Sequence, residues 1–184
     1  MSNTQAAVVL GGSGSVGNAL IKELIRNGSF NPIVLLLRRS QPDQVAMARD
    51  AGVELRETLV PAMDPADLET ATTEAAAGAD PTAAATGSGA AGMARYARVK
   101  GEAEEAVKES GPAVVSIFRP AMIIGSQHTP WLLEKVIPAF SFVTPAKYRS
   151  ITVEQIAKAM IATSLNTPAK SDVYHYPEMM ALNR

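Results

Sequence analysis

The chain has 184 residues, enough for one domain with its own hydrophobic core, and its 47% hydrophobic and 19% charged residues are ordinary for a soluble globular protein. Its formal net charge of -1 and its scattered Lys and Arg residues give no sign of a nucleic-acid binder, because such proteins cluster their basic residues. The absence of cysteine excludes disulfides, thiolate nucleophiles and Cys-type metal sites.

The N-terminal segment MSNTQAAVVLGG has no basic region, and its apolar run is too short for a signal peptide. No later run approaches the roughly 18 apolar residues of a membrane helix. We therefore expect a single cytoplasmic domain over residues 1–184, with neither a membrane span nor a nucleic-acid partner. His128 has no partners at ligand spacing, so we expect no metal site.

Residues 6–10 are apolar and rich in β-branched side chains, which predicts a buried parallel strand. Three glycines follow at a G-x-x-G-x-x-G spacing: Gly11, Gly14 and Gly17. Apolar residues then repeat at helical spacing up to a stop at Gly28: Val16, Leu20 and Leu24. Glycines let the backbone approach a pyrophosphate, and a helix N-terminus presents N–H groups to it. The pattern predicts a dinucleotide-binding turn; a glycine-rich turn without a ligand is the alternative.

A second buried strand is predicted over residues 33–37, and it ends in Arg38 and Arg39. An acidic residue at this distance from the glycines binds the ribose of NAD, whereas an arginine accommodates the additional phosphate of NADP. No Asp or Glu occurs between Glu23 and Asp43, so we predict NADP as the cofactor. Alternatively, both arginines are solvated charges at the end of a strand. A second helix, stopped by Gly52, and a third strand in residues 53–60 are expected next.

The stretch from 61 to 92 contains no Val, Ile, Phe, Tyr or Trp, so we predict no strand in it. A helix begins at Asp64 and Pro65, and residues 78–92 are expected to form a low-complexity loop. The sheet then lacks a strand beside its first one. Either the strand predicted over 113–119 fills that place, or an apolar edge is left to pair with another chain, which would favour a homo-oligomer.

Tyr96 and Lys100 are four residues apart on a predicted helix, and Lys100 falls within its apolar arc. An ammonium group beside a phenol favours the phenolate, so that the tyrosine can exchange a proton with a substrate oxygen. The alternative is a lysine whose stem lies on the core while its charged end reaches solvent.

In the last third, a buried strand over 113–118 is followed by the loop AMIIG, residues 121–125. An apolar group is expected to be a pocket wall, plain core or a partner surface: Trp131, Leu132, Ile137, Phe140 and Phe142. Thr152 and Gln155 predict a capping box at the start of a helix. Residues 172–176 are expected to contain a final short strand.

The chain resembles the short-chain dehydrogenase/reductase superfamily, and among its atypical members the Tat-interacting-protein-like oxidoreductases. The matching stretches are LGGSGSVG, LLLRRS, GADP, YARVKGEAE, SIFRPAMIIG and ITVEQIAKAMI, in the order of the family. The resemblance implies an α/β fold with a Rossmann-like, doubly wound, mostly parallel sheet. It also implies proton transfer by Tyr96, with Lys100 contacting the ribose and tuning the charge. The predicted cofactor-binding residues are Gly11, Ser13, Gly14, Ser15, Val16, Gly17, Arg38, Arg39, Lys100, Pro120, Ala121, Met122 and Ile123.

Two departures from the family accompany the resemblance. A strand, a helix and another strand are expected to be missing from the middle, so that the sheet lacks one or two central strands. Ala75 and Ala76 stand where the family carries a serine pair, whose hydroxyl holds the substrate carbonyl. The sequence therefore leaves two hypotheses: an NADP-dependent oxidoreductase that acts on a small carbonyl substrate, or a catalytically silent NADP-binding protein that senses redox state or docks a partner.

Overall fold

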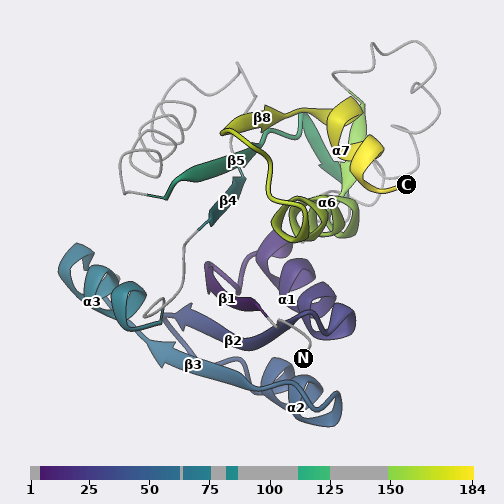
Figure 1. The fold of residues 1–184 in the computed structure, drawn as a ribbon. Coiled ribbons are helices and arrows are strands. Elements are labelled where there is room, and N and C mark those ends of the chain that lie inside the picture. The colour runs from purple at the N-terminus through teal and green to yellow at the C-terminus, as the bar shows by residue number, and fades with distance from the viewer. Residues whose placement is uncertain (1–4, 63, 76–81, 87–111, 125–148) are drawn as a thin grey trace. The chain divides into compact units, whose positions relative to one another are not determined.

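A computed structural model describes residues 5–62, 64–75, 82–86, 112–124 and 149–184 of the chain (Figure 1). The chain divides into two compact units, Met1–Asp80 and Pro81–Arg184. Both units combine parallel strands with helices, and each is described by itself below. The helix predicted around Tyr96 and the apolar group around Trp131 lie outside the described residues.

The first unit alternates strands and helices. Its elements are β1 (Gln5–Leu10), α1 (Ser15–Asn27), β2 (Phe30–Leu37), α2 (Pro42–Asp50), β3 (Leu55–Leu59) and α3 (Pro65–Ala75). The three strands form a parallel sheet in the order β1-β2-β3, with Leu10 opposite Leu36 and Leu37 opposite Leu59. All three strands therefore end at the same edge of the sheet, where ligands of parallel sheets bind.

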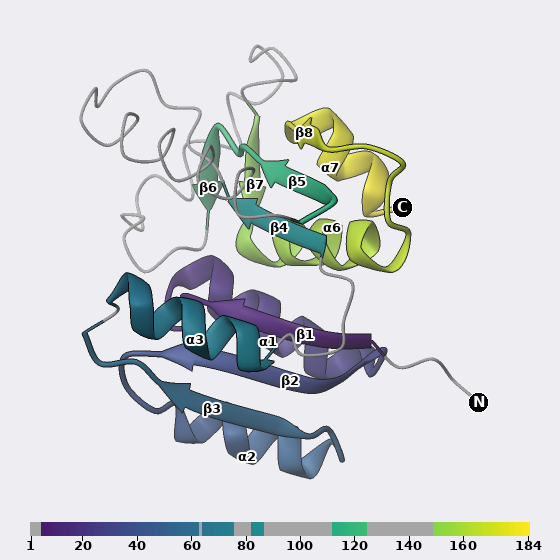
Figure 2. The ribbon, with the colours of Figure 1, turned by 60° about the vertical axis from the view of Figure 1, so that its left-hand side comes forward.

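Helices cover both faces of this sheet, which explains why residues 33–37 of β2 are all apolar. Val34 and Leu36 pack with Ala71 of α3 on one face. Figure 2 shows α3 on the opposite side of the sheet from α1. Residues Ile33 to Leu37 of β2 are all buried. The central strand of the unit is thus fixed from both sides, and so is the position at which it ends.

The second unit contains two groups of parallel strands. Its described elements are β4 (Thr82–Thr86), β5 (Val114–Phe118), β6 (Met122–Ile124), β7 (Ser150–Thr152), α6 (Val153–Leu165), β8 (Asp172–Tyr174) and α7 (Tyr176–Leu182). One sheet has the order β4-β5-β8, and β6 pairs with β7. The rings of Phe118 and Tyr174 stack with their centroids 5.0 Å apart, which joins β5 to β8 through side chains as well as backbone.

The fold confirms the predicted class, an α/β fold of Rossmann type with parallel strands, and most predicted elements are present. α1 ends at Gly28, whose φ of 70° is the left-handed conformation that favours glycine. Asp64 begins α3, because its carboxylate accepts the N–H of Ala66 at 3.0 Å. The capping box of Thr152 and Gln155 is present at the start of α6. Within the described ranges, no helix has both the length and the apolar character needed to cross a membrane.

Two predictions about the strands are wrong, and one of two alternatives is excluded. Residues 61–92 do contain a strand, because β4 occupies Thr82–Thr86 in the middle of the predicted loop. The strand β5 does not fill the place beside β1, since its two edges are taken by β4 and β8. Met122 and Ile123 were expected in a loop but belong to the short strand β6. Residues 82–86 are small and gave little strand signal of their own, and they form a strand through pairing with β5.

Candidate functional site

The glycine turn of the first unit begins directly after β1. Gly11 has a φ of +77°, a conformation that residues with a side chain rarely adopt. The N–H of Gly14 donates to the carbonyl oxygen of Gly11 at 3.0 Å and closes the turn. Gly14 is then the N-cap of α1, and its carbonyl accepts the N–H of Asn18 at 2.8 Å. The chain reverses within four residues, and α1 starts at the edge of the sheet.

The first turn of α1 packs directly on this reversal. A Cβ atom at Gly17 would lie 2.3 Å from the carbonyl oxygen of Gly11 and 2.9 Å from Cα of Gly12, so only glycine fits there. A Cβ atom at Gly12 would meet the side chain of Ile21 at 2.5 Å. Gly12 lies between the glycines of the spacing pattern, and the sequence analysis did not assign it to the site. Its packing against Ile21 could have been inferred only from the helix that follows.

The outer surface of the turn is open, and its electrostatics favour an anion. Gly11, Ser13 and Gly14 are exposed, whereas Ser15, Val16 and Gly17 are half-buried. Gly14 has no side chain with which to cap the helix, and the first turn of α1 contains no acidic residue. The N–H groups and the partial positive charge of a helix N-terminus bind phosphate in this arrangement. The geometry therefore fits the pyrophosphate of a dinucleotide.

The two arginines leave the same edge of the sheet. Leu37, the last residue of β2, is buried, and Arg38 and Arg39 follow it as exposed residues. Because Leu10 lies opposite Leu36 in the register, the arginines begin beside the glycine turn. Neither arginine forms an ion pair with an acid in the part of the chain that the structure describes. Their charge is available to an anion, as the predicted NADP site requires.

Glu57 of β3 is a residue of this region that was not predicted from the sequence. Its carboxylate accepts hydrogen bonds from the hydroxyl of Ser40 at 2.5 Å and from the N–H of Gln41 at 2.6 Å. Ser40 and Gln41 directly follow the arginines. No signal in the sequence links residue 57 to these positions, because the contact depends on the register between β2 and β3.

The remaining predicted site residues lie outside the described residues or in other elements of the chain. Tyr96, Lys100 and Ala76 lie outside them, as does His128. Ala75 is the last residue of α3 and packs against the cluster that contains Val34. The other four belong to the second unit: Pro120 and Ala121 after β5, and Met122 and Ile123 in β6. The candidate site described here is therefore the phosphate-binding turn with its two arginines.

A parallel sheet, a glycine turn without room for a Cβ atom and a helix starting on that turn define a Rossmann-type α/β domain. No family model and no curated protein matches the chain. Among solved structures, the fold is similar to a short-chain dehydrogenase/reductase from Brucella melitensis named as a glucose/ribitol dehydrogenase. The identity is 15% and the TM-score 0.64, over 93% of this chain and 95% of that one.

Two structures from Agrobacterium tumefaciens are similar to the chain as well. One, described as a gluconate dehydrogenase, has 12% identity and a TM-score of 0.64, and the match covers 97% of both chains. The other, described as a 2-deoxy-D-gluconate 3-dehydrogenase with bound NADP, has 15% identity and a TM-score of 0.61 over 96% of both chains. At these identities the likeness shows the fold, which is that of the short-chain dehydrogenase/reductase structures.

Proposed function

We propose that the protein binds NADP and reduces a small carbonyl compound by hydride transfer, as an oxidoreductase of short-chain dehydrogenase type. The observation that carries this proposal is the close packing of Gly17 on the glycine turn, which has room for backbone only. Such packing brings a helix N-terminus against a strand end, and that geometry serves pyrophosphate binding. The bound NADP in a structure of the same fold supports the choice of ligand.

In this proposal the cofactor phosphates have separate partners. The pyrophosphate lies over Gly11 to Gly14 and the N-terminus of α1. The 2′-phosphate, which distinguishes NADP from NAD, binds Arg38 and Arg39. Arginine suits this role because its planar guanidinium group donates two parallel hydrogen bonds to a phosphate.

The chemistry is assigned to residues known from the sequence pattern. When bound, NADPH supplies a hydride to the carbonyl carbon. The Tyr96 hydroxyl gives a proton to the carbonyl oxygen, so that the product is an alcohol. The ammonium group of Lys100 stabilises the tyrosinate that remains and contacts the ribose.

A binding experiment tests the cofactor assignment. Titration calorimetry of the wild-type protein should show NADP binding more tightly than NAD. Substituting Arg38→Ser or Arg39→Ser should weaken NADP binding about tenfold, the size of a charge-assisted hydrogen bond, and leave NAD binding within about twofold. Arg49→Ser is the matched control, since Arg49 is also exposed but lies in the last turn of α2. Absence of binding to either cofactor would contradict the proposal.

A kinetic experiment tests the reaction. NADPH oxidation with a panel of small aldehydes and ketones should be measurable for the wild-type protein. Tyr96→Phe should reduce the rate at least a hundredfold, because the proton donor is lost, while NADP binding is retained. Equal rates for the two proteins would contradict the role of Tyr96.

The second candidate function is a catalytically silent NADP-binding protein that senses redox state or docks a partner. The observation in its favour is Ala75, whose methyl group packs in an apolar cluster where the resemblance expects a serine hydroxyl. An enzyme without that hydroxyl loses part of the stabilisation of the developing oxyanion. NADP binding without turnover across the carbonyl panel would support this candidate over the first.

A further inference from the structure

Arg38 and Arg39 lie between two fixed points of the backbone. Before them, Leu37 is 2% exposed, and its carbonyl accepts the N–H of Val60 at 2.8 Å. After them, Ser40 and Gln41 both donate to the carboxylate of Glu57. The segment between these anchors has only two residues, and both are arginines. The position of their backbone is therefore set by β3, the strand beside them.

Glu57 also takes over the capping of α2. Gln41 is the N-cap of this helix, and Gln44 is its third residue, where a glutamine side chain can accept the N-cap N–H. In α6 this arrangement exists, because Gln155 accepts the N–H of Thr152 at 3.0 Å.

In α2 the side chain of Gln44 does not accept the N–H of the N-cap residue Gln41. Gln44 is 3% exposed, and both polar atoms of its carboxamide lack a hydrogen-bond partner in the described part of the chain. Glu57 accepts the N–H of Gln41 in its place, from another strand. A carboxylate at a helix N-terminus is also favoured by the helix dipole.

The carboxylate fixes this segment without neutralising it. No ion pair joins Glu57 to Arg38 or Arg39 among the described residues. Instead the two oxygens of Glu57 are occupied by the hydroxyl of Ser40 and the N–H of Gln41. The arginine side chains are exposed, and their backbone is held in place.

We propose that Glu57 is a positioning residue that gives the site its preference for NADP over NAD. This inference rests on the proposed function, because it assumes that Arg38 and Arg39 bind the 2′-phosphate. A ligand that meets an ordered backbone segment loses less entropy on binding than one that must order it. Loss of the Glu57 contacts should weaken the binding of NADP, whose 2′-phosphate contacts the arginines. It should not weaken the binding of NAD, which lacks the 2′-phosphate.

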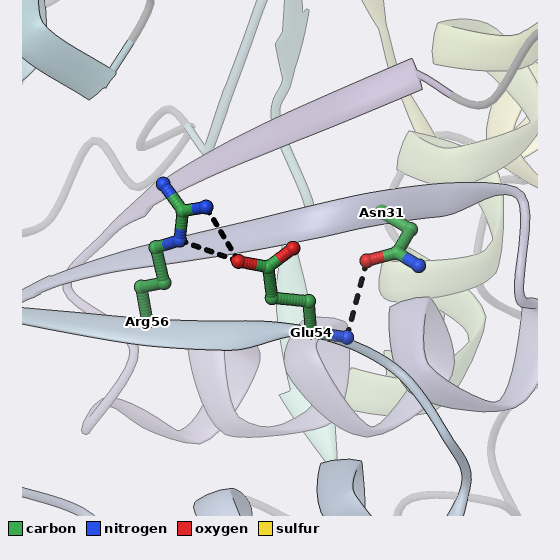
Figure 3. A network of polar contacts seen from close by, with 3 residues as sticks. All are labelled: Asn31, Glu54 and Arg56. Carbon is green, nitrogen blue, oxygen red and sulfur yellow. Dashed lines mark hydrogen bonds and ion pairs between the residues drawn. The ribbon is translucent and has the colours of Figure 1, made fainter.

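Glu57→Gln tests this inference, and Glu54→Gln is its matched control. Glu54 lies just before β3, is likewise acidic, and accepts hydrogen bonds from the Arg56 side chain, while its N–H donates to Asn31 (Figure 3). Both substitutions remove one negative charge from the same region. Only Glu57 contacts the segment after the arginines. Glu57→Asp is a second variant, which keeps the charge but is shorter by one methylene, so we expect it to hold the two donors less well.

Calorimetric Kd values for NADP and NAD are measured for the wild type and the three variants. For Glu57→Gln we expect NADP binding to be weaker by roughly five- to tenfold and NAD binding to stay within about twofold. Glu57→Asp should fall between this variant and the wild type, and Glu54→Gln should match the wild type. A residue with a merely structural role would weaken both cofactors equally. That result, or unchanged or tighter NADP binding in Glu57→Gln, would overturn the inference.

Amide hydrogen exchange separates this inference from the proposed function. Without any cofactor, the N–H of Gln41 should exchange faster in Glu57→Gln than in the wild type. In Glu54→Gln it should exchange at the wild-type rate. If the wild type does not bind NADP, the proposed function fails and the NADP preference assigned to Glu57 falls with it. If the wild type prefers NADP and Glu57→Gln retains the full preference, only the role of Glu57 is wrong.

Discussion

The glycines of the turn differ in how much room they leave for a side chain, although the sequence pattern does not distinguish them. A Cβ atom at Gly17 would contact backbone atoms of Gly11 and Gly12, and backbone cannot move aside without shifting the helix. A Cβ atom at Gly14 would come no closer than 3.4 Å to its nearest neighbour, the Gly11 carbonyl oxygen. Gly14 also has a φ of -75°, which any residue adopts.

We predict that Gly17→Ala lowers the free energy of unfolding by about 1–3 kcal/mol, the cost of forcing an atom into a packed region. Gly14→Ala should cost no more than about 0.5 kcal/mol, since alanine is only a poorer N-cap than glycine. Urea unfolding followed by circular dichroism measures both. Equal losses for the two variants would show that the packing of α1 on the turn is looser than described here.

At the scale of whole elements, the helices α2 and α6 carry a glutamine at the same position of their first turn. Gln155 takes part in a capping box, whereas Gln44 is buried with its carboxamide unpaired among the described residues. Burying an unpaired amide costs free energy, and a hydrogen-bonded one contributes it. The same substitution should therefore have opposite effects in the two helices.

We predict that Gln44→Met raises the free energy of unfolding by about 1 kcal/mol, because methionine fills a similar volume without polar atoms and has a similar helix propensity. Gln155→Met should lower it by about 1 kcal/mol, since the N–H of Thr152 loses its acceptor. Chemical denaturation of both variants is the measurement. Destabilisation by Gln44→Met would indicate that its carboxamide has a polar partner in solution.

The elements that could be predicted from the sequence are those with strong local signals. Residues 33–37 of β2 are a continuous apolar run, and α6 begins with a capping box, so both elements were predicted, although β2 starts three residues earlier, at Phe30. β4 could not be found, because its sequence TAAAT lacks large apolar residues and it is a strand through its pairing with β5. α7 was missed as well, although Pro177 and Glu178 in its first turn are typical of a helix start.

In the candidate site, too, the parts with a local sequence pattern could be predicted and a long-range contact could not. The glycines and the arginines stand at the spacing that is characteristic of one strand–helix–strand unit, so the sequence pattern predicted the strand, turn and helix around them. The contact of Glu57 with Gln41 spans 16 residues and depends on which strands are neighbours. Such contacts follow from the register of the sheet, which the sequence pattern did not specify.

For the whole molecule, the proposed ligand should stabilise the folded chain by mass action. At a free NADP concentration of about 100 times Kd, the expected gain is about 2.7 kcal/mol, provided that the unfolded chain does not bind. For a chain of this length, that corresponds to an increase in Tm of about 5–10 °C. A thermal melt followed by circular dichroism should show this shift with NADP and a smaller one with NAD at the same concentration. In the Arg38→Ser protein, tenfold weaker binding should reduce the gain at the same NADP concentration to about 1.4 kcal/mol, so the shift with NADP should fall to about half. A full shift with NADP would contradict the assignment of this arginine.

The same melt tests whether the chain unfolds as the single domain that its length predicts. Trp131 is the only tryptophan in the sequence and falls within the residue range 81–184 of the second unit, so we expect its fluorescence to report on that range. Circular dichroism at 222 nm follows the helices of both units. In a two-state protein all probes report one transition. We predict coincident midpoints without cofactor, and a common increase when NADP is added. If only the transition seen by circular dichroism shifted while the fluorescence midpoint stayed in place, the two units would be independent folding units, and the single-domain prediction would be wrong.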